Sequence, residues 1–555
     1  MRVTNLPPGT GATLFPMLAA RRLLSRRSNT LDPLSTPFKS EPYTVCSCYR
    51  DTCELHFNRE PIKIVSSRGQ YLIGDDGFEY LDCASRTSNV GHCHPRVVRA
   101  ATSQMSVFNT CIEDVVTCMP LEREYSKKLL ATLPSNFDVC LFTNSGAEAN
   151  DLALQLVRSY TQKKGVVVVD GSFHGSVDLL IDISPSAFKR MPTGKKPWVH
   201  VVPCPDMYRG PYSPNDPDAA EKHFQESKVV LDRVLARNGE VIEYNTPISR
   251  TDYTNKGYIH MHGGLVVADE IQTGMGRPGS HFWAFQTMGA IPDIITAGKP
   301  MGSGYPIAAV ITSRRIANSL SAVYNNYHCS PVAAAMGLSV LDIIHSERLM
   351  NNAVVLGEQF MSLLKELRTR HIYIGDVRGL GLIIGVDIVC GRDSKKPSPE
   401  LAEKISYRLK DQQVIVANEG ESKNVLTFIP PLCLTLSDIA NVITKLDKVL
   451  MELEVVQLND IQGIFREAQP QPSSRPLYLS SALAQAAPPI LSTAWTAPQY
   501  MFSKPSVTSS PLYSSIHENS SFCWLTWWPS LTFSRANGKL PLSPIGQGQA
   551  ALEGI

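Results

Sequence analysis

The chain has 555 residues, a formal net charge of +2 and 19% charged residues. A chain of this length is longer than a typical domain with a single hydrophobic core, so we expect two or three domains. The balanced charge argues against a chain-wide nucleic-acid surface, and no apolar run is long enough to span a membrane, so we expect a soluble protein with a small-molecule partner, no nucleic acid and no membrane.

Residues 1–31 contain five arginines and no acidic residue, with an apolar run from Leu14 to Ala20. This composition is typical of a mitochondrial transit peptide and predicts a protein of the mitochondrial matrix. A basic N-terminus without a targeting role, in a cytoplasmic protein, is the alternative. The 13 cysteines include no CxxC pair, which favours a reducing compartment over a disulfide framework.

A short Cys/His cluster, His92-Cys93-His94, follows further along the chain. Neighbouring side chains of a strand point to opposite sides, and no second group stands at the spacing of a metal ligand. We therefore interpret the cluster as a structural turn before Pro95 and predict no metal site.

Strand and helix signals alternate from Tyr43 to about Glu454. This alternation predicts a mostly parallel sheet covered on both faces, which is the core of an α/β enzyme. The stretches Val115 to Pro120 and Asn238 to Gly257 lack a clear helix or strand period.

The part of the chain after about Gln462 is rich in Ser, Pro and Ala and shows no period, so we expect a disordered tail. Most of the tryptophans lie in this tail, which is atypical of a solvated linker. A partner-binding segment or an extension foreign to the native protein would explain them, and both remain open: Trp495, Trp524, Trp527 and Trp528.

A predicted strand, Val139 to Phe142, runs into a predicted helix with apolar residues at helical spacing. The link Thr143-Asn144-Ser145-Gly146-Ala147 offers a hydroxyl and backbone N–H groups at the helix start, where the helix dipole favours a phosphate dianion. An ordinary capping box of Ser145 and Glu148 is the alternative, and for this motif alone it is the better interpretation.

A run of four valines predicts a second strand, which leads through Asp170-Gly171 to Phe173 and His174. Ligands of open α/β sheets bind at the carboxyl ends of strands, where an aromatic ring can stack on a flat heterocycle. Taken by itself, Phe173 is more often a core residue than a cofactor shelf.

A third predicted strand, Leu265 to Ala268, delivers Asp269 to its end. Beside a pyridine nitrogen, this carboxylate would keep the nitrogen protonated, so that the ring could accept electrons. A helix cap or a surface aspartate is the alternative. Gln272 and three nearby glycines favour a backbone that closely approaches a ligand: Gly274, Gly276 and Gly279.

Ile294 and Ile295 are predicted to end a fourth strand, and Lys299 follows in a loop rich in Gly and Pro. Desolvation and a neighbouring cationic ring would lower the pKa of this lysine and allow it to form an imine and move protons. An isolated lysine would be a weak candidate. The order of phosphate loop, aromatic residue, aspartate and lysine makes it a strong one.

These residues resemble those of the class III aminotransferases, which are fold-type I enzymes that use pyridoxal 5'-phosphate, over most of residues 55–454. The chain looks closest to the ethanolamine-phosphate and 5-phosphohydroxy-L-lysine phospho-lyases. The resemblance rests on the stretches EPIKIVSSRGQYL, NVGHCHPRVV, TNSGAEANDLAL, LLIDISPSAF, WVHVVPCPDMYRGPY, SHFWAFQ, GDVRGLGLIIGVD and NVLTFIPPLC.

The resemblance implies a large domain with a mostly parallel sheet, a smaller α+β domain, and a homodimer with its active sites at the subunit interface. It also implies a set of residues that hold pyridoxal 5'-phosphate. These are Ser145, Gly146 and Ala147 on the phosphate, Phe173 stacked on the ring with His174 beside it, Asp269 on the ring nitrogen, Gln272 near the ring hydroxyl, and Lys299 as the Schiff-base lysine.

We divide the chain accordingly. The predicted parts are a targeting or disordered N-terminus at 1–41, a first part of the small domain at 42–110, a large cofactor-binding domain at 111–315, a C-terminal small domain at 316–460, and the tail at 461–555.

One position bears on the reaction. Relatives that act on amino acids usually have an arginine in the segment matching VLTFIPPL, which would bind a substrate carboxylate in a bidentate way. Here the residue is Thr427, whereas Arg378 resembles a structural arginine of the family. This favours a lyase that removes phosphate and ammonia from phosphoethanolamine or 5-phosphohydroxy-L-lysine to give an aldehyde, although Thr273 is commoner in transaminases.

Three departures from the family pattern keep alternatives open. In residues 238–257, the family's strand with its glutamate is not recognisable. In 324–330, Asn326 replaces a threonine that in relatives reaches the cofactor phosphate of the partner subunit. Residues 111–120 lack the basic and aromatic run that the family pattern predicts. An alanine–glyoxylate or ω-amino transaminase and an inactive family member are therefore the alternatives.

Overall fold

The structure is a computed structural model and describes residues 56–109, 120–212, 215–238, 242–245, 257–320 and 329–467. The chain separates into two compact units, Met1–Asn58 and Arg59–Ile555. Only a short turn of the first unit is described, so the following concerns the second unit. The predicted targeting segment, Asn326 and nearly all of 111–120 lie outside the described residues.

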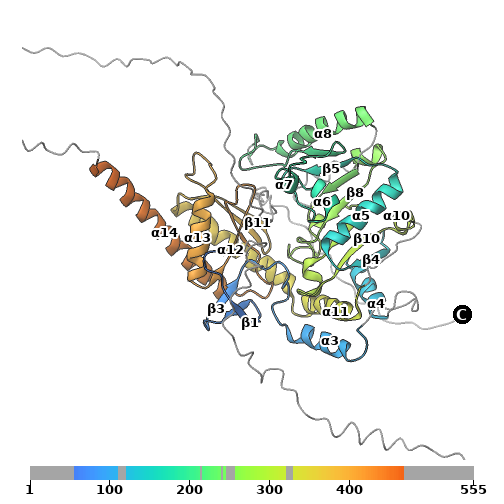
Figure 1. Ribbon diagram of the computed structural model, residues 1–555, viewed down its shortest axis with the longest axis horizontal. Helices are drawn as coiled ribbons and strands as arrows, with labels where there is room; N and C mark the ends of the chain where they lie inside the picture. Colours follow the sequence, from blue (N-terminus) through green and yellow to red (C-terminus); the bar gives the residue numbers. More distant parts are fainter. Residues whose placement is uncertain are drawn as a thin grey trace, which may run out of the picture. The chain divides into compact units, whose positions relative to one another are not determined.

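A seven-stranded sheet is the centre of the second unit (Figure 1), with the order β4-β10-β9-β8-β7-β5-β6. All pairs from β9 to β6 are parallel, whereas β10 is antiparallel to both β4 and β9. This confirms the predicted mostly parallel sheet. The strands are β4 (Val139–Thr143), β5 (Val166–Val169), β6 (Val199–Val202), β7 (Ile242–Asn245), β8 (Val266–Asp269), β9 (Ile294–Ala297) and β10 (Ala308–Thr312).

Strands β5, β8, β9 and β10 are buried along their whole length, because helices cover both faces of the sheet. Helix α5 packs against β4, β9 and β10, and α8 packs against β6. The apolar residues predicted at helical spacing in α5 are all buried. The helical segments here are α5 (Gly146–Thr161), α6 (Asp178–Asp182), α7 (Pro185–Phe188), α8 (Ala219–Asn238), α10 (Arg314–Ala317), and the 3-10 turns η1 (Ala284–Met288) and η2 (Lys299–Gly302).

Two four-stranded sheets accompany the large one, with the orders β1-β2-β3-β13 and β11-β12-β15-β14. The first sheet joins N-terminal and C-terminal segments of the chain, because the short strand β13 pairs in parallel with β3. Their strands are β1 (Ile64–Arg68), β2 (Tyr71–Gly74), β3 (Glu79–Asp82), β11 (Ile374–Leu380), β12 (Ile383–Ile388), β13 (Val414–Ile415), β14 (Ala417–Glu419) and β15 (Val425–Phe428).

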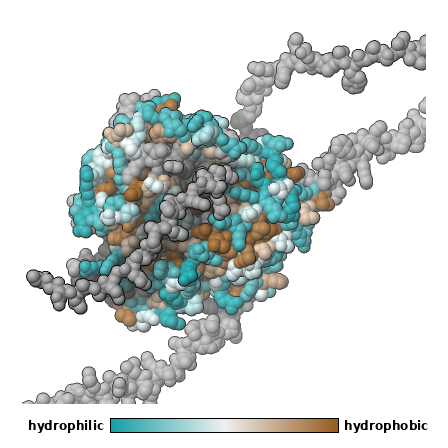
Figure 2. All heavy atoms as spheres, turned by 180° about the vertical axis from the view of Figure 1, so that it is seen from behind, coloured by the Kyte–Doolittle hydropathy of each residue, from teal (hydrophilic) through white to brown (hydrophobic). Residues whose placement is uncertain are grey.

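The remaining helices are α3 (Pro95–Met105), α4 (Pro120–Leu130), α11 (Pro331–Ser346), α12 (Leu349–Arg370), α13 (Pro399–Asp411) and α14 (Leu436–Glu467). Helix α11 packs against α3 and α4, and α14 packs against α12 and α13. None of the helices among the described residues is both long and apolar enough to cross a membrane. On the face shown in Figure 2, apolar residues form separate patches among hydrophilic ones.

Three expectations about elements were wrong. Segment 238–257 contains β7, a central strand that is too short to show a period. Ile294 begins β9 rather than ending a strand, because the buried run continues to Ala297. Helix α14 continues to Glu467, beyond the point at which we expected regular structure to end.

Candidate active site

The predicted phosphate loop lies between β4 and the first turn of α5. Ser145 is an exposed N-cap whose Oγ accepts the N–H of Glu148 at 3.2 Å. The Glu148 carboxylate accepts the N–H groups of Asn144 and Ser145 at 2.7 and 3.1 Å. The capping box of the alternative interpretation is therefore present. It leaves the N–H groups of Gly146 and Ala147, which a helix's first turn cannot satisfy by itself, for a bound anion.

Close backbone approaches bring three predicted segments together. A Cβ on Gly298 would lie 3.6 Å from the Cα of Gly146 and 3.3 Å from the side chain of Ile271. A Cβ on Gly175 would lie 3.2 Å from the Cβ of Ala147. The phosphate loop is thus in contact with the segments that carry Lys299, Asp269 and Phe173.

Asp269 is the last residue of β8 and is almost fully buried, at 1% exposure. Its Oδ2 accepts hydrogen bonds from Nδ1 of His174 and Nδ2 of Asn150, both at 2.9 Å. Its Oδ1 accepts the N–H of Ile271 at 3.2 Å. Because three donors orient the carboxylate, it can present a fixed negative charge to a ligand.

His174 lies beneath Asp269 in the core. Its Nε2 is 3.1 Å from Oγ of Ser172, so the imidazole connects the carboxylate with a second hydroxyl. The preceding residue, Phe173, is half-buried. The sequence did not single out Asn150 or Ser172, since their role depends on contacts between separate segments.

Lys299 begins the 3-10 turn η2 rather than lying in an irregular loop. The residue as a whole is half-buried, and its amine donates to Oε1 of Gln272 at 3.3 Å. Burial, assisted by the positive charge of Arg86 and opposed by Asp269, lowers the pKa of Lys299 to about 7. A substantial part of this amine is therefore neutral at neutral pH and able to attack a carbonyl.

Arg86 and Glu419 are charged residues near this lysine that the sequence did not indicate. They form an ion pair in which the side chains are only 13% and 3% exposed. Burial lowers the pKa of Arg86 to about 10. Their only sequence signal was a basic residue in the polar stretch SRTSN after β3, which cannot reveal a partner in β14.

Glu270, next to Asp269, is also buried, and burial raises its pKa to about 7. It accepts the hydroxyl of Thr273 at 2.7 Å and the N–H groups of Ala284 and Phe285 at 3.1 and 2.7 Å. Glu270 therefore fixes the SHFWAF turn. Thr273, whose identity favoured a transaminase, supports that same turn.

The two positions discussed for carboxylate binding hold no available arginine. Thr427 is buried in β15 and donates to the carbonyl of Ala417 at 3.3 Å. Arg378 pairs with Asp376 at 2.9 Å and Asp387 at 3.0 Å, and it is buried. This network supports the interpretation of Arg378 as a structural residue.

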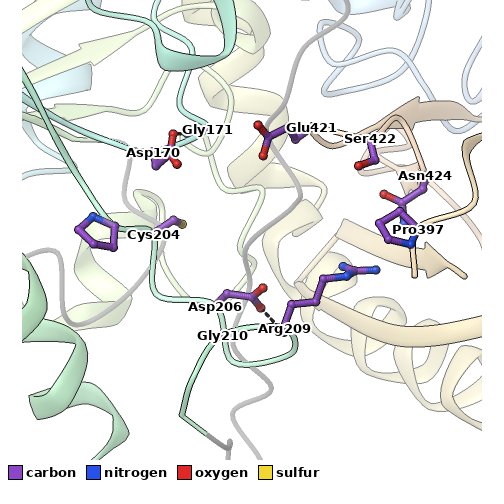
Figure 3. Close-up of a pocket in the computed structure, with 11 residues that line it drawn as sticks. Asp170, Gly171, Cys204, Asp206, Arg209, Gly210, Pro397, Glu421, Ser422 and Asn424 are labelled. Carbon is purple, nitrogen blue, oxygen red and sulfur yellow. Dashed lines mark hydrogen bonds between the residues drawn. The ribbon is translucent and has the colours of Figure 1, made fainter. Parts of the chain in front are cut away.

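A cavity of about 380 Å³ opens beside the end of β5, between Asp170 and the chain around Glu421 (Figure 3). Lys189 bridges these two carboxylates at 2.9 and 3.0 Å. Arg209, on the opposite wall, donates to both oxygens of Asp387. Because the charged groups of the cavity pair with one another, we assign it no ligand.

The His92-Cys93-His94 cluster forms a turn, with Cys93 at a φ of 50°. Nε2 of His92 lies 2.7 Å from Asp82, and Nε2 of His94 lies 3.1 Å from Glu347. Both imidazoles thus hold the turn in place.

Residues 56–450 match the family of class-III aminotransferases. The chain belongs to this family. Class III enzymes use pyridoxal 5'-phosphate, and the donor set of this site fits that cofactor, with an amine of lowered pKa, a buried carboxylate and open N–H groups at a helix start. The predicted family and cofactor are confirmed.

The relatives that match the chain include one named as an aminotransferase and one named as a phospho-lyase. An "alanine--glyoxylate aminotransferase 2-like" protein of Drosophila melanogaster is 35% identical over 69% of this chain and 81% of its own length. An "ethanolamine-phosphate phospho-lyase homolog 1" of Caenorhabditis elegans is 36% identical over 72% of this chain and 90% of its own length. These relatives agree on the family, and their names include both a lyase and a transferase.

A solved phospholyase from Arthrobacter, in complex with phosphoethanolamine, has a TM-score of 0.66 and 29% identity, covering 77% of this chain and 99% of the other. This confirms the α/β fold of fold-type I. A further relative, the mitochondrial alanine–glyoxylate aminotransferase 2 of Homo sapiens, is 30% identical over 68% of this chain and 79% of its own length.

Proposed function

We propose that the protein is a pyridoxal-phosphate-dependent lyase that removes phosphate and ammonia from a phosphorylated amine and yields an aldehyde. Phosphoethanolamine and 5-phosphohydroxy-L-lysine are the proposed substrates. The observation that carries the lyase over a transaminase is the buried Thr427 hydroxyl on a backbone carbonyl, together with an Arg378 that is held in ion pairs. Neither position can bind an α-carboxylate; phosphoethanolamine has none, and in 5-phosphohydroxy-L-lysine the α-carboxylate is remote from the side-chain amine next to the phosphate.

The cofactor supplies an aldehyde that attaches the substrate amine and a ring that accepts electrons. Gly146 and Ala147 would bind its phosphate through their N–H groups, and Phe173 would lie against its ring. Asp269, oriented by Asn150 and His174, would hold a proton on the ring nitrogen. Gln272, already bonded to Lys299, would stand beside the ring hydroxyl.

Lys299 has two roles in this proposal. As a neutral amine it would hold the cofactor, and once freed it would remove a proton from the carbon that bears the substrate nitrogen. Phosphate would leave from the adjacent carbon, and water would release ammonia. The overall balance for phosphoethanolamine is one water consumed, with one acetaldehyde, one phosphate and one ammonium formed.

Phosphate release tests this proposal directly. We expect the cofactor-loaded enzyme to release phosphate from phosphoethanolamine or phosphohydroxylysine without any keto-acid acceptor, and Lys299→Ala to release none. Activity that strictly requires an acceptor would identify a transaminase. Absence of a cofactor absorbance band that depends on Lys299 would identify an inactive family member.

We also propose a homodimer located in the mitochondrial matrix. The relative from Homo sapiens bears the word mitochondrial in its name, and residues 1–31 have the composition of a transit peptide. Exposed apolar side chains between residues 98 and 108 offer a surface for a second subunit: Val98, Met105, Val107 and Phe108. Imaging of the full chain with and without residues 1–31 tests the location.

A further inference from the structure

Beyond the effect of Arg86 on the pKa of Lys299, the ion pair of Arg86 and Glu419 has no part in the chemistry described so far. Both side chains are largely buried, and Glu419 is held in β14 by its pairing with Val425 of β15. Removing two charges from water is costly, and their mutual attraction often only balances that cost. A buried pair at the edge of a reactive site is therefore more easily explained by binding than by stability.

The loop of Arg86 is attached to the segment that carries the site. Nδ2 of Asn89 donates to the carbonyl of Met275 at 2.8 Å, and Met275 follows Gln272, the acceptor of the Lys299 amine. The positive charge of Arg86 also acts on Lys299, where it lowers the pKa of the amine. Both observations place Arg86 close to the site that contains Lys299.

Glu419 is an incomplete partner for this arginine. Its Oε1 contacts Arg86, whereas its Oε2 is buried without a hydrogen-bond donor among the described residues. A buried carboxylate oxygen that lacks a donor loses hydration without compensation. A phosphate dianion carries more charge and offers three oxygens to the planar guanidinium, so it would be the stronger partner.

We propose that Arg86 binds the phosphate of the substrate amine, and that Glu419 is the counterion which Arg86 leaves when the substrate enters. The identity of the anion rests on the proposed lyase function. Arg86 is then the residue that selects phosphorylated amines over neutral ones. Glu419 competes with the substrate and sets how tightly it binds.

Inorganic phosphate and the cofactor-saturated enzyme provide the test. We expect phosphate to raise the thermal midpoint of the wild-type holoenzyme, and Glu419→Gln to bind phosphate several-fold more tightly and to lower KM for phosphoethanolamine. Arg86→Lys should raise both the Kd of phosphate and KM by about tenfold to a hundredfold, because bidentate charge-assisted bonds are lost, with a smaller change in kcat.

Glu421→Gln is the matched control. It removes the same charge two residues beyond Glu419, after the end of β14, but its carboxylate is 65% exposed and pairs with Lys189 instead. Phosphate affinity and KM should stay within about twofold of the wild type, since an exposed charge is screened by solvent. The double variant Arg86→Met/Glu419→Gln removes both charges of the pair, so that neither is left without its partner; it should keep the thermal midpoint without phosphate and lose the response to phosphate.

The outcomes separate the two proposals. Unchanged phosphate affinity and KM in Glu419→Gln, Arg86→Lys and the double variant would overturn the anion site. A wild-type enzyme that binds phosphate through Arg86 but releases none from phosphoethanolamine would refute the lyase and retain the anion site. If the Arg86 variants weakened the binding of β-alanine, which carries a carboxylate, and left the binding of phosphate unchanged, the phosphate assignment would be refuted.

Discussion

The amine of Lys299 connects the local environment of one residue with the chemistry of the site. Burial and Arg86 together lower the pKa of this lysine to about 7, so half of the amine is neutral near that pH. Two hydrogen-bonded networks, on Gln272 and on Asp269, then hold the neighbouring polar groups in place. The reactivity of the lysine is therefore a property of packing rather than of the lysine alone.

The lowered pKa of Lys299 predicts how cofactor capture depends on pH. The protonated amine does not attack an aldehyde, so the rate at which the apoenzyme binds pyridoxal 5'-phosphate should fall about tenfold per pH unit below pH 7 and level off above it. Stopped-flow absorbance measures this rate. Arg86→Gln should move the inflection to higher pH because a cation that depresses the pKa is lost; an inflection that stays in place would refute the role of Arg86.

Some site residues could be predicted from the sequence and others could not, for a physical reason. Asp269 and Lys299 follow buried apolar runs, and a polar residue at a strand end has a local signature. Asn150, Ser172 and Glu419 act through contacts between segments distant in the chain, which no local pattern encodes. The phosphate loop is an intermediate case. Its motif is visible in the sequence, but the same residues predict both an ordinary capping box and anion-binding N–H groups.

At the level of elements, the start of α5 serves two purposes that an experiment can separate. Ser145→Ala removes the N-cap and should lower the free energy of unfolding of the apoenzyme by about 1 kcal/mol. If Ser145 also binds the cofactor phosphate, cofactor affinity should fall in addition. Chemical denaturation and a cofactor titration measure the two effects.

The control for this prediction is Glu148→Gln, which keeps an acceptor for the N–H groups of Asn144 and Ser145. It should change the stability and the cofactor affinity much less than Ser145→Ala does. A Ser145→Ala enzyme with lower stability but unaltered cofactor affinity would reduce this loop to an ordinary helix cap.

The sheet of β11, β12, β15 and β14 depends on a buried charge network. Arg378 pairs with Asp376 and Asp387, and Arg209 reaches Asp387 from outside the sheet. Removing one partner of a buried pair leaves an uncompensated charge, so Arg378→Ala should lower the free energy of unfolding by about 3–5 kcal/mol. Urea unfolding with the cofactor at saturation measures this change.

Arg314→Ala serves as the comparison, because Arg314 and its partner Asp138 are 70% and 44% exposed. Screening by water makes such a pair weak, so this variant should unfold at nearly the wild-type urea concentration. Equal losses in both variants would show that Arg378 is not the centre of the network. A normally stable Arg378→Ala enzyme with a raised KM would instead make Arg378 a substrate residue.

Short strands limit what the sequence reveals about elements. Strand β7 completes the parallel part of the large sheet, yet its four residues, IEYN, are too few to show a period. Strand β13 has only two residues and pairs with β3, which is distant from it in the chain. Both strands exist because neighbouring strands supply hydrogen bonds, which is tertiary information.

At the scale of the whole molecule, the fold class can be predicted from the alternating strand and helix patterns, whereas the order of the strands in the sheet cannot. Strand β4 lies at one edge of the large sheet, far from β5, which follows it in the chain, and antiparallel β10 lies between β4 and β9. Alternation alone cannot specify this arrangement. It nevertheless predicts the edge where the site forms, since the carboxyl ends of β5, β8 and β9 deliver their following residues to one side of the sheet.

The exposed apolar residues around the end of α3 provide the prediction for the assembled molecule. Val107 is 79% exposed and Met105 is 52% exposed, which is costly for an isolated subunit. We expect Val107→Asp to shift a dimer to monomers in analytical ultracentrifugation and to reduce phosphate release at low protein concentration, because burying a charge at an interface is unfavourable.

The control is Val229→Asp, which introduces the same charge on α8, at a residue that is 49% exposed. It should leave both the mass of the assembly and the activity unchanged. A wild-type enzyme that is a fully active monomer at every concentration would contradict the predicted dimer and assign this apolar surface to a different partner.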